Sequence, residues 1–289
     1  MRVLVTGSSG FIGSNLCDFL RDKRHQVYEV DKSNRREPVD IRNFEKLRRV
    51  FSKTKPDVVF HLAALASMQA GEENPFEAYS TNVIGTLNVI ECANKFDAKI
   101  IFTSSAAVYG ETKIVPTPET APLSPINVYG ATKVAAEQLI GLRAKKSAIF
   151  RLFNVYGPKC RRSYVIPDVV RKISERQNPL KALGTGEERR DFVYIDDVIK
   201  AFMLNIEKDA KGIFNVGTGK PICIKDLIKN ILDTAGFKTK IMFAGSTRRG
   251  DFSCNWADID KIKSELGWQP ETTLEEGLKK TIEWYNKPN

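Results

Sequence analysis

The sequence lacks the residue clusters that metal sites and disulfide frameworks require. It has two histidines, His25 and His61, and neither lies beside a cysteine or a second histidine. The five cysteines are odd in number, widely spaced and include no Cys-x-x-Cys pair. Reduced thiols in the cytoplasm explain this usage better than disulfides, which form in oxidising compartments. We therefore expect a cytoplasmic protein without a bound metal.

Long apolar runs are also missing. No apolar stretch approaches the roughly 18 residues of a transmembrane helix, and the short run after Met1 leads directly into an expected core strand. We therefore expect neither a membrane span nor a signal peptide. The net charge of +10 has two interpretations, which are attraction of anionic ligands and a solvated Lys/Arg surface, and we favour the second. Since the basic residues are dispersed and form no stripe with aromatics, we expect no nucleic-acid partner.

The first half of the chain alternates short apolar runs with amphipathic helical patterns. The expected strands are 2–6, 26–30, 58–62, 100–104 and 148–153. The expected helices are 11–23, 44–52, 74–94 and one that contains Tyr129 and Lys133. Such alternation predicts right-handed βαβ units, and hence an α/β fold with a doubly wound parallel sheet.

Prolines and glycines interrupt this alternation after Asn154. The pattern predicts a Rossmann-type domain over residues 1–153, to which residues 189–216 return. We expect residues 154–188 and 217–289 to form a smaller α/β domain that binds the substrate.

A glycine-rich loop follows the first expected strand. Gly7, Gly10 and Gly13 stand where a strand leads into a helix, which is the context that gives the pattern a mechanism. The first glycine permits a tight turn, the second lets the backbone approach a pyrophosphate, and the third lets helix and strand pack closely. The N–H groups at the helix N-terminus then bind the pyrophosphate.

Asp31 stands at the end of the second expected strand, 18 residues after Gly13. A carboxylate there accepts hydrogen bonds from both ribose hydroxyls and repels a 2′-phosphate, so the loop predicts NAD rather than NADP. Two alternatives stay open. The neighbouring cations Lys32, Arg35 and Arg36 could accommodate a phosphate, or Asp31 could be only a turn residue.

Tyr129 and Lys133 are four residues apart on an expected helix, so they share one face, one turn apart. A nearby cation stabilises a phenolate and lowers the pKa of the tyrosine. Lowering that pKa from about 10 to near neutrality costs about 4 kcal/mol. A lysine at about 5 Å, at an effective dielectric of about 20, supplies roughly 3 kcal/mol. The pair therefore predicts a general base, and the alternative is a core tyrosine whose hydroxyl is satisfied internally.

With its Gly-x-x-Gly-x-x-Gly loop and Tyr-x-x-x-Lys pair, the chain resembles the short-chain dehydrogenase/reductase superfamily. Its length and C-terminal half resemble the extended branch, which acts on nucleotide sugars. Further resemblances follow in order along the chain, at 40–41, 61–64, 81–86 and 104–110. The resemblance implies an NAD site made of Gly7, Ser9, Gly10, Phe11, Ile12, Gly13, Asp31, Asp40, Ile41, Leu62, Ala63, Ala64, Asn82, Tyr129 and Lys133.

The resemblance also implies the catalytic roles. Tyr129 would remove a hydroxyl proton while a hydride leaves the same sugar carbon for NAD. Lys133 would hold the nicotinamide ribose, and Ser105 would donate a hydrogen bond to the reacting oxygen.

Two alanines, Ala106 and Ala107, follow Ser105. In the 4,6-dehydratases of the family this place holds an Asp-Glu pair that moves protons during water elimination, and decarboxylases tend to keep a Glu there. Alanine cannot carry a proton, so the resemblance leaves a reaction that needs only oxidation and re-reduction at one carbon, which is 4-epimerisation. The form Ser-Ala-x-Val-Tyr-Gly resembles that of UDP-glucose (galactose) 4-epimerases. The alternatives are another nucleotide-sugar reductase, dehydrogenase or dehydratase, or a non-catalytic NAD-binding or RNA-associated regulator.

The second half of the chain resembles segments that bind the nucleotide sugar. Two arginines in these segments, Arg190 and Arg248, suit bidentate binding of a diphosphate.

Asn255 stands where some 4-epimerases carry a bulky tyrosine, so the smaller residue predicts room for an N-acetyl group. The chain is shorter than typical 4-epimerases, which leaves the nucleotide base open, with UDP favoured. The resemblance further suggests a homodimer through helices near 86–94 and 131–142. The substrate-binding residues that it implies are Ser105, Tyr129, Asn154, Val165, Arg190, Arg248 and Asn255.

Overall fold

The computed structural model of the chain describes residues 1–289 except 35–36, 161–163, 246–253 and 288–289. The chain divides into two compact units. Unit 1 contains residues 1–110, 121–152 and 202–214, and unit 2 contains 111–120, 153–201 and 215–289. None of the helices described is both long and apolar enough to cross a membrane.

Unit 1 is built on a parallel sheet. Its strands are β1 (Arg2–Thr6), β2 (Gln26–Val30), β3 (Val58–His61), β4 (Lys99–Ser105), β5 (Ser147–Leu152) and β9 (Gly212–Val216), the last of which continues into unit 2. Its helices are α1 (Phe11–Asp22), α2 (Phe44–Thr54), α3 (Met68–Glu73), α4 (Pro75–Tyr79), the π turn η1 (Ser80–Ile84), α5 (Gly85–Lys95), the 3-10 turn η2 (Ala106–Val108), α6 (Val128–Arg143) and the end of α8 (Ile195–Lys208).

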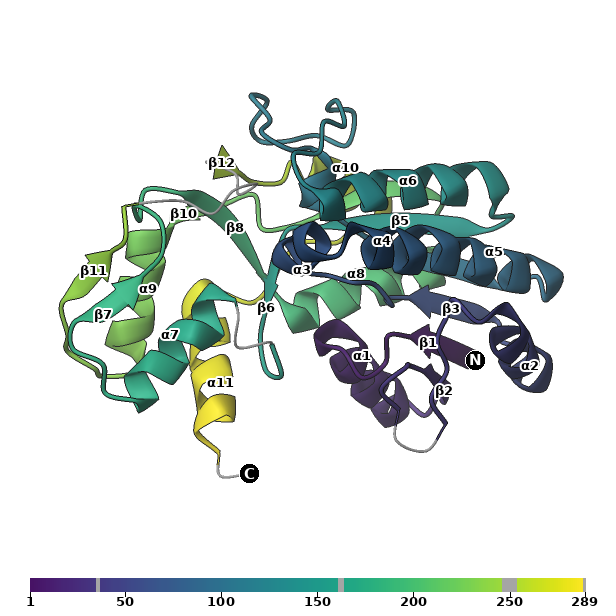
Figure 1. The fold of residues 1–289 in the computed structure, drawn as a ribbon, viewed down its shortest axis with the longest axis horizontal. Helices are drawn as coiled ribbons and strands as arrows, with labels where there is room; N and C mark the ends of the chain where they lie inside the picture. Colours follow the sequence, from purple (N-terminus) through teal and green to yellow (C-terminus); the bar gives the residue numbers. More distant parts are fainter. Residues whose placement is uncertain (35–36, 161–163, 246–253, 288–289) are drawn as a thin grey trace. The chain divides into compact units, whose positions relative to one another are not determined.

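The strands follow the order β2-β1-β3-β4-β5-β9, and all pairings from β2 to β5 are parallel. The order reverses between β1 and β3, and ligands of doubly wound sheets bind beside such a switch point, at the carboxyl ends of the strands. Helices cover both faces, with α5 and α6 along one and α1 and α8 along the other (Figure 1). The prediction of a doubly wound Rossmann-type α/β fold is confirmed.

Aromatic side chains fill the layer between the sheet and α8. The rings of Phe60 and Phe202 lie 5.8 Å apart, and Phe150 lies 5.1 Å from Phe202 and 5.7 Å from Phe214. All four side chains are fully buried. A strand covered on both faces is buried throughout, which explains the consecutive apolar residues 58–60 in β3 and 100–102 in β4.

Two helices illustrate how the structure differs from the sequence-based expectation. The helix expected over 74–94 is divided by the π turn η1, where a single wider turn replaces the regular α-helical spacing. Helix α8 was not expected, because its first turn carries Asp196 and Asp197 within a segment interpreted as a ligand-binding motif. Propensity does not reveal it, since its stability comes from packing Phe202 against the sheet.

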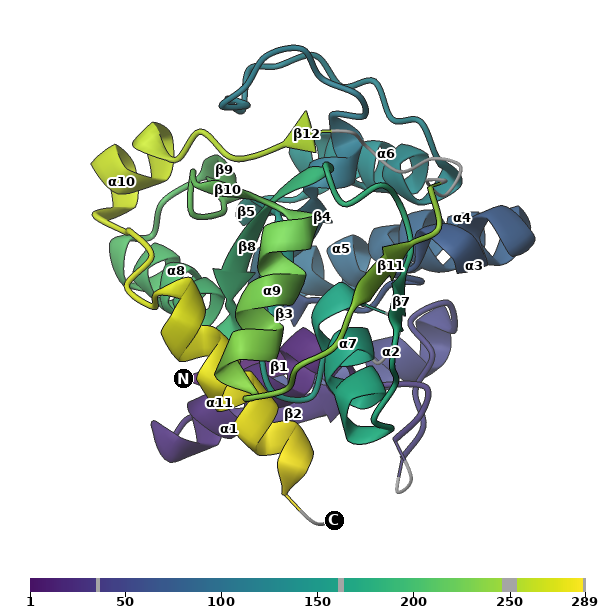
Figure 2. The same ribbon diagram turned by 90° about the vertical axis from the view of Figure 1, so that its left-hand side faces the viewer.

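Unit 2 is a smaller α/β assembly. Its strands are β6 (Asn154–Tyr156), β7 (Leu180–Ala182), β8 (Arg189–Tyr194), β10 (Pro221–Cys223), β11 (Ile241–Phe243) and β12 (Cys254–Asn255). Its helices are α7 (Val165–Ser174), the start of α8, α9 (Ile224–Thr234), α10 (Asp260–Leu266) and α11 (Leu274–Asn286). β8 pairs with β6, β10 and β12, and β7 pairs with β11. Helices α7, α9 and α11 pack together beside these strands (Figure 2).

The boundary of unit 2 lies elsewhere than the sequence suggested. Residues 189–201, expected to return to the first domain, belong to unit 2, and only residues 202–214 return. The reason is strand pairing. β8 pairs with three strands of unit 2. The sequence alone does not show which of several short strands will pair with one another.

Candidate active site

The glycine loop sits at the switch point of the sheet. Gly7 has a φ of +73°, and a Cβ there would lie 2.7 Å from the backbone nitrogen of Ala63. A Cβ on Gly13 would lie 2.2 Å from the carbonyl oxygen of Gly7. The chain therefore needs glycine at both positions, since a side chain would separate α1 from the loop, or the loop from the segment after β3.

The N-terminus of α1 fits the pyrophosphate of a dinucleotide. Gly10 is the N-cap and supplies no capping side chain, and the first turn contains no acidic residue. The partial positive charge of that helix end is thus available to an anion. The Asp31 carboxylate accepts from the backbone N–H of Ser9 at 3.1 Å and of Ser33 at 2.7 Å, which holds it beside the loop. These residues fit a dinucleotide ribose and pyrophosphate. Arg35 and Arg36, weighed as phosphate partners, lie outside the described residues.

Asp40 and Ile41 are held against α5. Asp40 is paired with Arg42, whose hydrogen bond holds the pKa of that carboxyl below its usual range. Ile41 is buried, and its side chain occupies the space that a Cβ on Gly85 would need. The side chain of Asn88 donates to the carbonyl oxygens of Ile41 and Arg42.

A buried chain of hydrogen bonds runs through His61, which sequence reasoning identified only as part of a motif. Thr86 donates its hydroxyl proton to the carbonyl oxygen of Asn82 (2.6 Å), so it can only accept from Nε2 of His61 (2.9 Å). Nδ1 is therefore the acceptor, and Thr6 donates to it at 2.8 Å while accepting from the backbone N–H of Ala63 at 3.2 Å. Burial and the Lys133 charge lower the pKa of His61 to about 3, which agrees with this neutral tautomer.

From the π turn η1, Asn82 extends this chain of hydrogen bonds to α6, the helix that carries Tyr129. Its amide oxygen accepts from the backbone N–H of Leu65 at 2.8 Å, and its amide nitrogen donates to the hydroxyl of Thr132 at 2.8 Å. Thr132 in turn donates to the carbonyl oxygen of Tyr129. π turns are frequent at functional sites, and this one aims Asn82 between the segment after β3 and α6.

The predicted catalytic residues all lie in unit 1, at the carboxyl end of β4 and the start of α6. Tyr129 is half-buried in the first turn of α6, and Ser105 is half-buried at the end of β4. The Ser105 hydroxyl accepts from the backbone N–H of Ala107 at 3.2 Å. Its own proton is then available to a second oxygen.

Lys133 is a buried cation one turn after Tyr129. Its ammonium donates to the carbonyl oxygen of Thr103 at 2.7 Å and lies 4.7 Å from the centroid of the Phe102 ring. It stands 6.0 Å from the centroid of the Tyr129 ring. Burial lowers the pKa of Lys133 to about 8, and the carboxylate of Glu137 opposes that shift. The side chain therefore keeps its charge at neutral pH beside the phenol.

Apart from Ser105 and Tyr129, the residues predicted for the nucleotide sugar belong to unit 2. Arg190 on β8 and Asn255 on β12 are partners in the parallel register, so they lie side by side. Asn255 is 2% exposed, and its amide oxygen has no hydrogen-bond partner among the residues the structure describes. The Asn154 side chain donates to the carbonyl oxygen of Asp191, and Val165 opens α7. Arg248 lies outside the described residues.

Asp191 organises this part of unit 2, and sequence reasoning named it only within a motif. Its carboxylate accepts from the backbone N–H groups of Thr218 (2.7 Å), Gly219 (2.9 Å) and Ala257 (3.1 Å). It is fully buried, and this burial raises the pKa of the carboxyl. Asp191 thereby holds the segment that ends β12 next to β8, which sets Asn255 beside Arg190.

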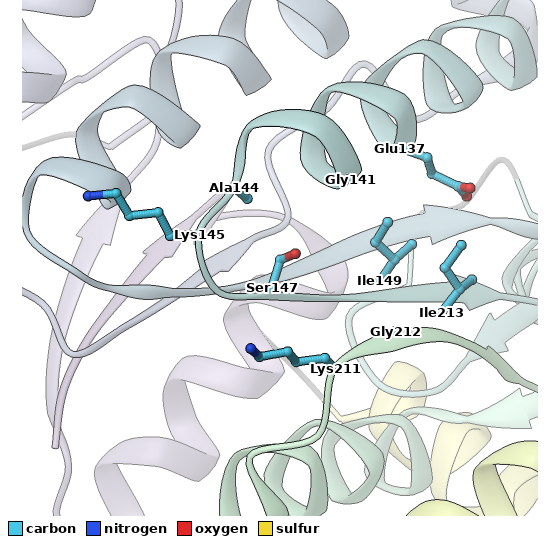
Figure 3. A pocket seen from close by; sticks show the side chains of 9 residues that line it. All are labelled: Glu137, Gly141, Ala144, Lys145, Ser147, Ile149, Lys211, Gly212 and Ile213. Atoms are coloured by element: carbon cyan, nitrogen blue, oxygen red, sulfur yellow. The ribbon is translucent and has the colours of Figure 1, made fainter.

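The hollow shown in Figure 3 is distinct from the candidate active site. It has a volume of about 270 Å³ and lies between the C-terminal half of α6 and the strands β5 and β9. Glu137, Ile149 and Ile213 line one end, and Lys145 and Lys211 stand at the other (Figure 3). Tyr129 and Lys133 are absent from its described lining.

Comparison with known proteins agrees with this geometry. The model of the NAD dependent epimerase/dehydratase family matches residues 3–217. A putative UDP-glucose 4-epimerase from Methanocaldococcus jannaschii is 35% identical over 99% of both chains. The crystal structure of a UDP-glucose 4-epimerase from Thermotoga maritima with UDP-glucose covers 99% of this chain and 98% of its own, with 34% identity and a TM-score of 0.92.

Further relatives, two of them named for other substrates, align over nearly all of this chain. A UDP-glucuronate 4-epimerase from Thermodesulfobacterium geofontis is 32% identical over 97% of this chain and 95% of its own. A UDP-glucuronic acid decarboxylase from Xenopus tropicalis is 29% identical over 99% of this chain and 72% of its own. The UDP-glucose 4-epimerase of Thermus thermophilus, solved with NAD, covers 99% of both chains at 28% identity and a TM-score of 0.90.

A Rossmann-type sheet with a dinucleotide loop and a Tyr-Lys-Ser constellation defines a nicotinamide-dependent enzyme of the extended short-chain dehydrogenase/reductase class. The chain belongs to the NAD-dependent epimerase/dehydratase family of that class. Its cofactor is NAD, which confirms the prediction from the glycine loop and Asp31.

Proposed function

We propose that the protein is a UDP-sugar 4-epimerase that oxidises and re-reduces one sugar carbon. The observation that carries this proposal is the turn after Ser105. Ala106 and Ala107 are 7% and 5% exposed, and they occupy the place where water elimination needs proton carriers. The complete set of Ser105, Tyr129 and Lys133 supports catalysis rather than a binding-only role.

In the proposed reaction, the Tyr129 phenolate oxygen takes the proton of the sugar hydroxyl and later returns it. The buried Lys133 ammonium stabilises that phenolate, since an opposite charge nearby favours the ionised form. Ser105 donates its hydroxyl proton to the reacting oxygen, because its own oxygen already accepts from Ala107. Bound NAD supplies a reversible hydride acceptor. Gly7, Gly10, Gly13 and Asp31 would hold its pyrophosphate and adenine-side ribose.

Binding of the nucleotide sugar is assigned to unit 2. Arg190 and Arg248 would bind the diphosphate, and Asn154 and Val165 would contact the same ligand. The amide oxygen of Asn255 is buried and has no hydrogen-bond partner within the part of the chain that the structure describes, which supports a substituent that donates a hydrogen bond, such as an acetamido N–H. We infer that N-acetylated UDP-hexoses are substrates together with UDP-glucose and UDP-galactose.

The proposal extends to a cytoplasmic homodimer. All five cysteines are free thiols, as expected in a reducing compartment. Large apolar side chains stand exposed on the helical layer of α4, η1 and α6, namely Phe76 (83%), Ile84 (52%) and Leu142 (82%). Such residues support an interface between copies, with the helices near 86–94 and 131–142 at its centre.

The test is conversion without added cofactor. Purified protein is incubated with UDP-galactose, and separately with its N-acetylated counterpart, and the 4-epimer is quantified. We expect conversion of both, and loss of conversion in Tyr129→Phe with NAD content unchanged. Turnover only of a 4-keto sugar, and only when NADPH is supplied, would overturn the epimerase assignment in favour of a reductase.

A further inference from the structure

Three buried charges lie behind the catalytic tyrosine, and the reaction proposed above uses only one of them. Lys133, Glu137 and Arg151 are 3%, 5% and 2% exposed. Lys133 and Glu137 stand one turn apart on α6, and Arg151 comes from β5. Buried charges are costly unless they are paired, so the pairing among these three determines which charge the active site experiences.

Glu137 forms an ion pair with Arg151. The Nε of Arg151 donates to both carboxylate oxygens, at 3.0 and 3.2 Å, and an Nη donates at 2.7 Å. Ser104 donates its hydroxyl to the same carboxylate. The other Nη of Arg151 donates to the Tyr109 hydroxyl at 2.9 Å, and the guanidinium lies 4.9 Å from the centroid of that ring. Glu137 and Arg151 thus form a neutral unit anchored from three elements.

Lys133 is left without such a partner. Its ammonium donates to the Thr103 carbonyl oxygen, and none of the ion pairs described in the chain includes it. The titratable and charged groups that face it are Tyr129 and Glu137 from α6, His61 from β3 and, through Glu137, Arg151 from β5. His61 is held neutral by its hydrogen bonds to Thr6 and Thr86. The charge balance around Lys133 is therefore controlled by one pair.

We propose that Arg151 and Glu137 are positioning residues that set the working pH of the Tyr129–Lys133 base. Arg151 occupies the Glu137 carboxylate, so that this carboxylate does not neutralise Lys133. The cation then acts on the Tyr129 phenol. This inference rests on the proposed function in one respect, which is that Tyr129 is the base.

Removing Arg151 and removing Glu137 should shift the titration of the Tyr129 phenol in opposite directions. In Arg151→Met, Glu137 becomes an uncompensated anion one helical turn from Lys133, so the phenolate is disfavoured. In Glu137→Gln, Arg151 becomes an uncompensated cation, so the phenolate is favoured. Glu137 stands eight residues after Tyr129 on α6, which is about 12 Å along the helix axis. At an effective dielectric of about 20, an unbalanced unit charge at that distance moves the titration of the phenol by about one pH unit. The double variant restores neutrality and should titrate close to the wild type.

Two readouts test this on the NAD-containing protein as purified. The first is the ultraviolet absorbance of the Tyr129 phenolate against pH, taken as the difference from the same variant carrying Tyr129→Phe. The second is the acid limb of kcat/KM. We expect Arg151→Met to shift both to higher pH by about one unit, with about tenfold less activity below the wild-type midpoint. Glu137→Gln should shift both to lower pH by a similar amount.

The matched control is Arg143→Met on α6, the helix that carries Lys133 and Glu137. It removes the same charge from an ion pair with Glu91 (2.8 Å) in which both side chains are exposed. Solvent screens that pair, so neither readout should move. If Arg151→Met does not fold, the near-isosteric Glu137→Gln carries the test alone.

A uniform loss of activity at every pH, with the phenolate titration unmoved in Glu137→Gln and Arg151→Met, would show that the pair is only structural and would overturn the proposal. Shifts of the same sign in the two variants would overturn it as well. If the two variants shift the phenolate titration in opposite directions but the protein does not epimerise UDP-sugars, the role of Arg151 and Glu137 is supported and the proposed function is not.

Discussion

Gly130 offers a sharp test of how the fold brings Ser105 and Tyr129 together. It follows Tyr129 on α6, and a Cβ there would lie 2.6 Å from the carbonyl oxygen of Ala107 and 3.0 Å from the Cβ of Pro125. Ala107 belongs to the turn directly after Ser105. The missing side chain therefore lets the first turn of α6 touch the turn that carries the serine.

In Gly130→Ala, two effects oppose each other. Alanine is favoured over glycine within a helix by about 1 kcal/mol. Overpacking against a backbone carbonyl costs about 1–3 kcal/mol, and relief requires α6 to move away from η2 by roughly half an ångström. We expect the clash to prevail, with a net loss of about 1 kcal/mol of stability. Since a displacement of about 1 Å at a catalytic site costs about 100-fold, we expect kcat to fall about tenfold.

Gly141 supplies the matched control on the same helix, because nothing lies within 4 Å of a Cβ there. Gly141→Ala should raise the free energy of unfolding by about 0.5–1 kcal/mol and leave kcat unchanged. Thermal midpoints and kcat measured for both variants decide the matter. If Gly130→Ala is as stable and active as Gly141→Ala, the close approach of α6 to η2 does not position the catalytic pair.

Three further predictions concern other buried contacts. In wild type, neutral His61 should make the free energy of unfolding fall as pH is lowered from about 6.5 toward 3, because only the unfolded state takes up a proton at this histidine. The loss should be at most about 1.4 kcal/mol per pH unit. Acid unfolding of His61→Gln should therefore be less steep, and an identical slope would contradict this. Gly277→Ala should destabilise the protein despite its better helix propensity, because a Cβ there would lie 2.1 Å from the Tyr156 hydroxyl; an unchanged or higher melting temperature would refute the clash. Asp191→Asn should raise the KM for the nucleotide sugar far more than it lowers the NAD content, since Asp191 holds β12 beside β8; unchanged KM would remove that role.

Much of the fold of unit 1 was predictable because local signals agreed with one another. The expected strand 26–30 matches β2, and the helix expected from Phe11 begins at that residue. Buried parallel strands are short apolar runs, and amphipathic helices between them are periodic, so the alternation is informative. The dinucleotide loop was equally predictable from the sequence. Its close contacts require glycine at fixed positions between a strand and a helix, and that spacing is visible in the residue order.

The arrangement of unit 2 was not predictable in the same way. β8, β10 and β12 are short strands, and their pairing depends on a buried carboxylate, Asp191, that reaches three backbone N–H groups distant in sequence. No local pattern distinguishes such a carboxylate from a surface one. Helix α8 was missed for a related reason, since tertiary burial of its apolar face stabilises it.

The sequence by itself determined the class of fold, the dinucleotide loop, and the presence of a tyrosine and a lysine one helical turn apart. These depend on spacing along a single chain segment, which residue order specifies directly. Only the tertiary structure decided that Glu137 pairs with Arg151 rather than with Lys133, and that His61 is a neutral link between Thr6 and Thr86. The state of a buried charge depends on which partners other elements bring to it, and that is a property of packing.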